Sequence, residues 1–188
     1  MKKIAIFASG SGTNAQNIIE YLNNKGIAKT EIILSNKKDS YVLERARQFD
    51  VPTVVFNRDE FYNSDTIPNL LDKYQVDLVI LAGFLWLIPE NLLKAYPNKI
   101  VNIHPALLPK YGGKGMYGAK VHESVVENKE EWTGITIHYI NERYDEGDII
   151  FQAKCKVEPS DNAETVAQKV HSLEYKHFPK IIEDILCR

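Results

Sequence analysis

An asparagine and a histidine stand two residues apart in the stretch IVNIHPALLP, as Asn102 and His104. Side chains two apart on a strand project from the same face, so this pair can meet one substrate atom. An amide can stabilise a developing oxyanion, and an imidazole can move protons. Pro105 ends the strand, which predicts that both residues lie at the carboxyl edge of a parallel sheet, where such sheets bind ligands. A structural histidine is the alternative, but the neighbouring amide and the glycine-rich stretch that follows favour catalysis.

A second candidate site is the N-terminal loop (residues 9–14) in the stretch IFASGSGTN. Gly10, Gly12 and Ala15 match the glycine pattern of a dinucleotide loop, but the second strand ends in Ser-Asn-Lys without the acid that would hold a ribose. A Walker A loop is excluded because no Gly-Lys-Ser/Thr follows. Backbone N–H groups of Gly12, Thr13 and Asn14 could still hold one phosphate monoester at a helix N-terminus. A tight turn that merely needs glycine is the alternative.

The elements that must position these residues follow from hydrophobic patterning. Apolar, β-branched runs predict strands over residues 4–8, 31–35, 53–56, 77–82 and 100–104, separated by stretches with helical spacing. This alternation is typical of βαβ units. We expect an α/β fold with a single doubly wound, mostly parallel β-sheet flanked by helices, Rossmann-like in outline. Thr13 or Asn14 is the expected N-cap of the first helix.

The pattern changes after His104. Two prolines and four glycines within the long loop (residues 105–118) indicate a shaped, functional segment rather than regular structure. A helix is expected at about residues 119–128, then strands over 133–140 and 148–157 joined by a polar turn. A last helix is expected from about Asn162, with a kink at Pro179.

Composition narrows the functional classes. The 188 residues carry 23 Lys and Arg against 25 Asp and Glu, a formal charge of −2 that gives no general attraction to nucleic acid. No apolar run approaches the length of a membrane helix, and the two cysteines form neither a disulfide framework nor a metal quartet. We expect a cytoplasmic protein that acts on small molecules without nucleic acid or membrane, as a monomer or weak homodimer.

Five separated blocks occur in the order and spacing of the folate-dependent formyltransferases, and the chain resembles that family over essentially its whole length. The blocks are ASGSGTN, SNKKDSYVLERAR, LAGFLWLIP, VNIHPALLPKYGG and TGITIHYINERYDEGDII. The resemblance implies a single formyltransferase domain over residues 1–188. It also implies a one-carbon transferase that uses 10-formyltetrahydrofolate as co-substrate and needs no metal.

The acceptor is a separate question. The NIHP and TGITIH blocks are shared with the members that formylate methionyl-tRNA and with formyltetrahydrofolate deformylases, so they specify the chemistry only. The tRNA-dependent members add a basic C-terminal domain and the deformylases an N-terminal regulatory domain, and we expect neither here. The N-terminal loop resembles the one that holds ribose 5-phosphate in the members of purine synthesis. The resemblance therefore implies glycinamide ribonucleotide as acceptor, with its formylated form and tetrahydrofolate as products.

The resemblance also implies roles for individual residues. The catalytic residues are Asn102, His104 and Asp145, with Asp145 pairing with His104 in proton transfer. The acceptor phosphate and ribose are bound by Gly12, Thr13, Asn14 and Glu174. The folate is bound, largely through backbone, by Leu85, Trp86, Leu87, Ile88, Asn102, Asn141, Glu142, Arg143, Tyr144 and Asp145.

Alternatives remain for several positions. Without the resemblance, Asp145 would be a solvated turn residue and Glu174 a surface acid. Trp86 departs from the arginine that many relatives carry, and can be a folate contact or a packing wall. Lys114, in a loop longer than that of bacterial relatives, is expected to be solvated rather than an anion contact. The rival functions are a non-catalytic nucleotide-binding module of the same fold and a formyltransferase with another amine acceptor.

Overall fold

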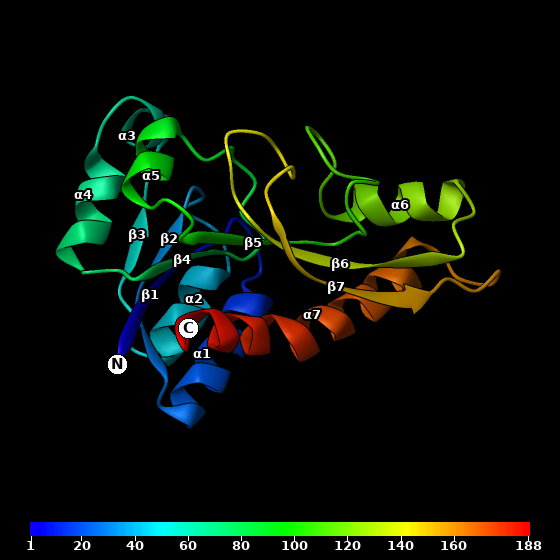
Figure 1. The fold of residues 1–188 in the computed structure, drawn as a ribbon, viewed down its shortest axis with the longest axis horizontal. Coiled ribbons are helices and arrows are strands. Elements are labelled where there is room, and N and C mark those ends of the chain that lie inside the picture. The colour runs from blue at the N-terminus through cyan, green and yellow to red at the C-terminus, as the bar shows by residue number, and fades with distance from the viewer.

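Seven strands form one sheet in the order β3-β2-β1-β4-β5-β6-β7 in the computed structural model, which describes residues 1–188 (Figure 1). The strands are β1 (Lys2–Phe7), β2 (Ala28–Ser35), β3 (Thr53–Val55), β4 (Leu78–Leu81), β5 (Ile100–His104), β6 (Trp132–Tyr139) and β7 (Ile149–Lys156). The first five in chain order pair in parallel, whereas β6 pairs antiparallel with both β5 and β7. The expected α/β fold with a mostly parallel sheet is therefore confirmed.

Seven helices accompany the sheet. They are α1 (Thr13–Lys25), α2 (Val42–Gln48), α3 (Arg58–Tyr62), α4 (Thr66–Lys73), α5 (Glu90–Ala95), α6 (Ala119–Glu127) and α7 (Ala163–Leu186). None of them combines the length and apolar character needed to cross a bilayer.

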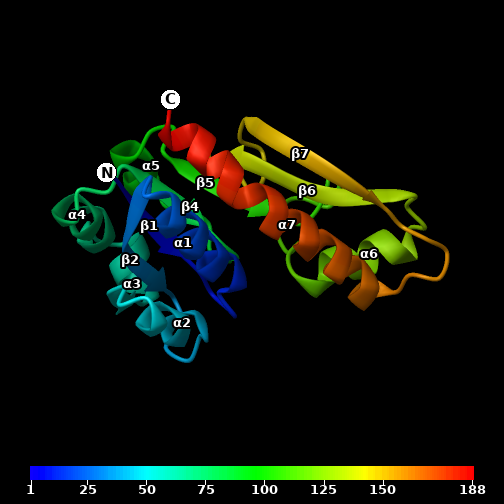
Figure 2. The same cartoon turned by 90° about the horizontal axis from the view of Figure 1, so that it is seen from below.

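The two faces of the sheet carry separate hydrophobic cores. Along β1, Ile4 and Ile6 join the core that packs under α1, α2 and α7, while Ala5 and Phe7 join the core under α3, α4 and α5. Burial on both faces explains why β4 is apolar at every position, and β1 from Ile4 onward, rather than alternating. The 24-residue helix α7 runs beside α1 across one face, and the first and last helices of the chain are therefore neighbours (Figure 2).

Local differences from the sequence-based expectations have physical causes. The N-cap of α1 is Gly12, in a left-handed conformation with φ of 74° and no capping side chain, so the expectation of Thr13 or Asn14 was wrong. A glycine tolerates that backbone conformation without strain. Strand β2 begins three residues earlier than expected, at Ala28. Helix α7 begins after Asn162, which caps it, and continues through Pro179; the expected kink stays a prediction.

Candidate active site

One cavity of about 530 Å³ opens at the carboxyl edge of the parallel strands. Its lining residues come from the N-terminal loop, the segment after β4, the end of β5, the long loop, the turn between β6 and β7, and the helices α6 and α7. They include the expected positions Gly12, Thr13, Asn14, Leu85, Trp86, Leu87, Ile88, Asn102, His104, Arg143, Tyr144, Asp145 and Glu174. Asn141 and Glu142 lie in the same turn but are exposed and outside the lining.

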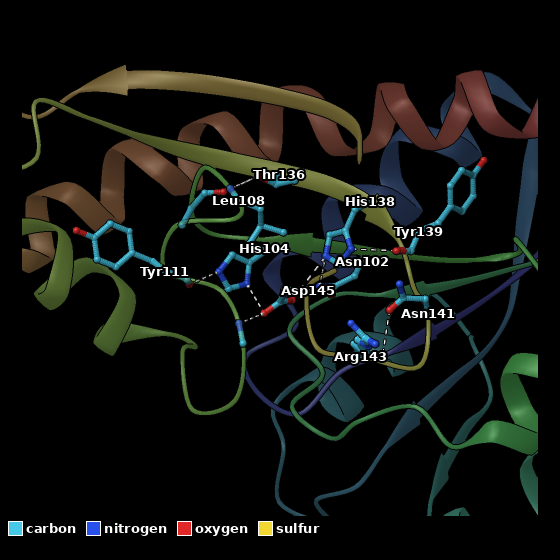
Figure 3. A network of polar contacts seen from close by, with 12 residues as sticks. Asn102, His104, Leu108, Tyr111, Thr136, His138, Tyr139, Asn141, Arg143 and Asp145 are labelled. Carbon is cyan, nitrogen blue, oxygen red and sulfur yellow. Dashed lines mark hydrogen bonds and ion pairs between the residues drawn. The ribbon is translucent and has the colours of Figure 1, made fainter. Parts of the chain in front are cut away.

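Asn102 is held by a buried histidine on the adjacent strand. The Asn102 amide Nδ2 donates to Nε2 of His138 at 3.1 Å, and His138 Nδ1 donates to the Tyr139 carbonyl at 3.0 Å (Figure 3). Burial lowers the pKa of the His138 imidazole below its usual value, although the nearby Asp145 carboxylate opposes this. A neutral His138 with its proton on Nδ1 therefore fixes the Asn102 amide and leaves its second N–H free for a ligand.

His104 lies between a backbone carbonyl and a carboxylate. Its Nε2 donates to the Tyr111 carbonyl at 2.7 Å, which leaves Nδ1 facing Asp145 Oδ2 at 3.5 Å (Figure 3). Asp145 Oδ2 also accepts the Gly113 N–H at 3.0 Å, and Asp145 Oδ1 lies 3.7 Å from His138 Nε2. The His104 side chain is 5% exposed and that of Asp145 12%, so their electrostatic interaction is only weakly screened by water.

The register between β5 and β6 sets this geometry. Asn102 lies opposite His138 and His104 lies opposite Thr136, so alternate residues of two strands meet on one face of the sheet. The Thr136 hydroxyl donates to the Ala106 carbonyl at 2.7 Å and accepts the Leu108 N–H at 3.0 Å. The sheet thus also fixes the start of the long loop, whose Tyr111 carbonyl orients His104.

Asp145 reaches the site through the backbone conformation of the turn between β6 and β7, residues 140–148. The residue has a positive φ of 56°, a left-handed conformation that aspartate tolerates better than most side chains do. Asn141 Oδ1 accepts the Arg143 N–H at 2.9 Å within the same turn. A Cβ at Gly147 would lie 1.7 Å from the Tyr139 carbonyl oxygen, so only glycine allows the turn to close there.

The other end of the cavity is built by the N-terminal loop and α7. Glu174, 4% exposed, accepts from Asn14 Nδ2 at 2.8 Å and lies 2.9 Å from His171 Nδ1. The alternative of a solvated surface acid at Glu174 is therefore wrong. Asn14 Oδ1 and His122 Nδ1 are buried without a hydrogen-bond partner in the protein, and both residues line the cavity. Such orphan groups are commonly satisfied by a ligand or water.

The segment after β4 forms an apolar wall. Trp86 packs on Phe56, Phe61 and Phe84 and also lines the cavity, with the Arg58 guanidinium 4.9 Å from its ring centroid. The indole of Trp86 thus packs against the aromatic core, and its contact with folate stays a prediction. Lys114 lines the cavity and is exposed. No group of three or more His, Cys, Asp or Glu side chains is arranged to hold a metal ion.

The sequence-based reasoning missed three histidines, which are His122, His138 and His171. His138 is two residues after Thr136 on a strand, a spacing that puts both on one face, but the partner strand was not known. His171 precedes Glu174 by one helical turn, and that i, i+3 spacing is the signal that could have found it.

His138 and His171 should make the stability of the folded protein depend on pH in opposite directions. Because the pKa of His138 is lowered in the folded state, unfolded chains bind more protons below about pH 6.5, and stability should fall as the pH drops from there. The hydrogen bond with Glu174 raises the pKa of His171, so its contribution is present below about pH 6.5 and lost as the pH rises through the folded value. Between about pH 7 and 5, the melting temperature should drop less than in the parent for His138→Gln and more for His171→Gln. Parallel curves for all three proteins would contradict this.

Comparisons with known proteins agree with this geometry. Residues 2–182 match the family described as formyl transferase. The chain is 39% identical to phosphoribosylglycinamide formyltransferase of Haemophilus influenzae, over 97% of this chain and 86% of that protein. It is 41% identical to the chloroplastic enzyme of that name from Arabidopsis thaliana, over 96% of this chain, but spans only 64% of that relative's length. The crystal structure of glycinamide ribonucleotide transformylase 1 from Symbiobacterium toebii superposes with a TM-score of 0.89 at 33% identity, covering 99% of this chain and 88% of that one.

Proposed function

Because the chain belongs to the formyl transferase family, we propose that it transfers the formyl group of 10-formyltetrahydrofolate to the amino group of glycinamide ribonucleotide in purine synthesis. The observation that carries the proposal is the convergence of Asn102, His104 and Asp145 in the lining of one cavity. The N-terminal loop, a candidate anion site, lies at one end of this cavity, and the apolar segment after β4 lines another side.

The residues present fit both substrates. At the acceptor end, the N–H groups of Ser11, Gly12 and Thr13 make no hydrogen bond within the protein, and α1 directs its positive dipole end toward them. The buried Glu174 carboxylate and the orphan Asn14 Oδ1 can accept hydrogen bonds from ribose hydroxyls. Trp86, Ile88 and Ile140 supply apolar surface for a flat ring such as a pterin.

The reaction forms a carbon–nitrogen bond to the acceptor amine, breaks the formyl bond to N10 of the donor, and moves one proton from the attacking to the leaving nitrogen. Asn102 donates its free amide N–H to the formyl oxygen as negative charge develops there. His138 holds that amide in place through a hydrogen bond that needs no reorganisation during the reaction.

His104 and Asp145 handle the proton. With Nε2 committed to the Tyr111 carbonyl, His104 receives and returns a proton at Nδ1, next to the Asp145 carboxylate. The carboxylate stabilises the imidazolium that forms. An Asp145-bound water can connect Nδ1 with the two reacting nitrogens, because one water spans such gaps in general acid–base catalysis.

The direct test is formation of formylated product by purified protein with formyltetrahydrofolate and glycinamide ribonucleotide. We expect turnover, and no turnover when a phosphorylated ribose without the glycinamide amine is offered instead. Tight binding of both substrates without product would identify a non-catalytic binding module. Faster transfer to another primary amine would overturn the assignment of the acceptor and keep that of the chemistry.

A further inference from the structure

We propose that Arg45 of α2 is a positioning residue that orients the backbone N–H groups of the N-terminal loop toward the acceptor phosphate. The inference rests on the proposed function for the identity of the ligand. It assigns a role to a side chain that lies outside the cavity and touches no substrate in the proposed reaction.

Three successive carbonyl groups of the N-terminal loop accept hydrogen bonds from α2 or α1. The Gly10 carbonyl accepts the Val42 N–H at 3.1 Å, and the Ser11 carbonyl accepts Nε of Arg45 at 2.8 Å. The Gly12 carbonyl accepts the Gln16 N–H at 2.9 Å as the first bond of α1. Two of the three anchors therefore come from α2, and the only side chain among the three is that of Arg45.

Anchoring a carbonyl also directs the N–H group that follows it. In a planar trans peptide the C=O and the next N–H point in opposite directions. Carbonyls of Gly10 and Ser11 that face α2 therefore turn the N–H groups of Ser11 and Gly12 away from α2. These N–H groups find no partner in the protein, as expected of a preformed anion cradle.

The Arg45 side chain is itself fixed rather than free to reach a ligand. Its guanidinium stacks 5.0 Å from the centroid of the Tyr41 ring, and Nη1 donates to Gln16 Oε1. Arg45 Nε is thus committed to the Ser11 carbonyl and Arg45 Nη1 to Gln16. We therefore expect Arg45 to act on the acceptor through the loop backbone rather than through direct contact.

The test compares Arg45→Gln with Arg47→Gln as a matched control. Arg47 lies two residues along the same helix, is exposed, and pairs only with Glu44, so its loss removes the same charge without touching the loop. Both variants, checked by thermal melts for folding, are assayed with glycinamide ribonucleotide and with its dephosphorylated riboside.

We expect Arg45→Gln to raise KM for the ribonucleotide roughly tenfold, the size of one charged hydrogen bond, with kcat and the folate KM nearly unchanged. The preference for ribonucleotide over riboside in kcat/KM should fall by the same factor and stay unchanged in Arg47→Gln. Equal losses on both acceptors would mean a merely structural role, and no loss would also overturn the proposal.

Two further measurements distinguish backbone positioning from a long-range effect of the Arg45 charge. The difference between Arg45→Gln and the parent should persist in roughly 1 M salt, where charges are screened within about 3 Å; its disappearance would mean that Arg45 acts by charge. Binding of inorganic phosphate, followed by calorimetry, should weaken in Arg45→Gln but not in Arg47→Gln. This measurement needs no turnover, so it tests the positioning role even if the assigned acceptor proves wrong.

Discussion

Asp145→Asn is expected to lower kcat by roughly two to four orders of magnitude, the usual contribution of general acid–base catalysis, with folding and both KM values nearly unchanged. The substitution keeps the size of the side chain, and its amide oxygen can still accept the Gly113 N–H. It removes the carboxylate that lies 3.5 Å from His104 Nδ1. Steady-state kinetics on the purified variant, with a thermal melt, measure the effect.

The matched control is Asp148→Asn, the same chemical change three residues along the chain at an exposed position. It should leave kcat within a factor of about two, since exposed substitutions away from a site change little. Near-normal turnover in Asp145→Asn would mean that the carboxylate is only a turn residue.

The double variant Asp145→Asn with His104→Ala tests whether the two side chains act as one unit. If they do, it should be little worse than the less active single variant, because the first substitution already disables the shared proton path. Additive losses in the free energy of activation would assign separate roles to the two residues.

Gly12→Val should weaken binding of the acceptor far more than binding of the folate. The acceptor KM should rise by roughly tenfold or more while the folate KM changes little. A Cβ at Gly12 would lie 2.4 Å from Val42 Cγ2, and the φ of 74° is strained for valine. The N-terminal loop must therefore shift away from α2, and its N–H groups lose their common direction. We also expect a melting temperature lower by roughly 5 °C or more from overpacking and backbone strain.

Gly10→Ala is the matched control for that substitution. A Cβ at Gly10 has no protein neighbour within 4 Å, so the melting temperature should stay close to that of the parent; the substitution is a control for stability only, because Gly10 lines the cavity. Equal weakening of acceptor and folate by Gly12→Val would show that the loop supports the whole cavity and is not specific to phosphate.

The architecture was predictable because its signals are local. Residues 78–82 are apolar throughout, since a central parallel strand is covered on both faces, and β4 forms there. The pair Asn102 and His104 could be placed at a strand end from spacing and Pro105 alone. The N-cap of α1 was mispredicted because Gly12 takes a left-handed conformation and lies too close to Val42 of α2 for a Cβ, a contact that the local sequence does not show.

The residues that the sequence hid depend on contacts between distant segments. His138 contacts Asn102 only because the register of β6 against β5 places the two residues opposite each other. The sequence of one strand alone does not determine that register. Glu174 looked like a surface acid because nothing near it in sequence shows that α7 covers α1. Residue-level assignments for the folate, such as Asn141 and Glu142, stay predictions.

The hydrogen bond between Asn14 and Glu174 joins residues 160 positions apart. During synthesis the N-terminal loop leaves the ribosome long before the helix that completes the acceptor end. At the usual pace of elongation, roughly 5–20 residues per second, the early strands wait on the order of ten seconds for α7. Over that time the apolar face that α7 later covers through Val166, Val170, Phe178 and Ile182 lies open. The nascent chain is therefore most exposed to aggregation just before α7 docks, and we expect acceptor binding to begin only with that docking step.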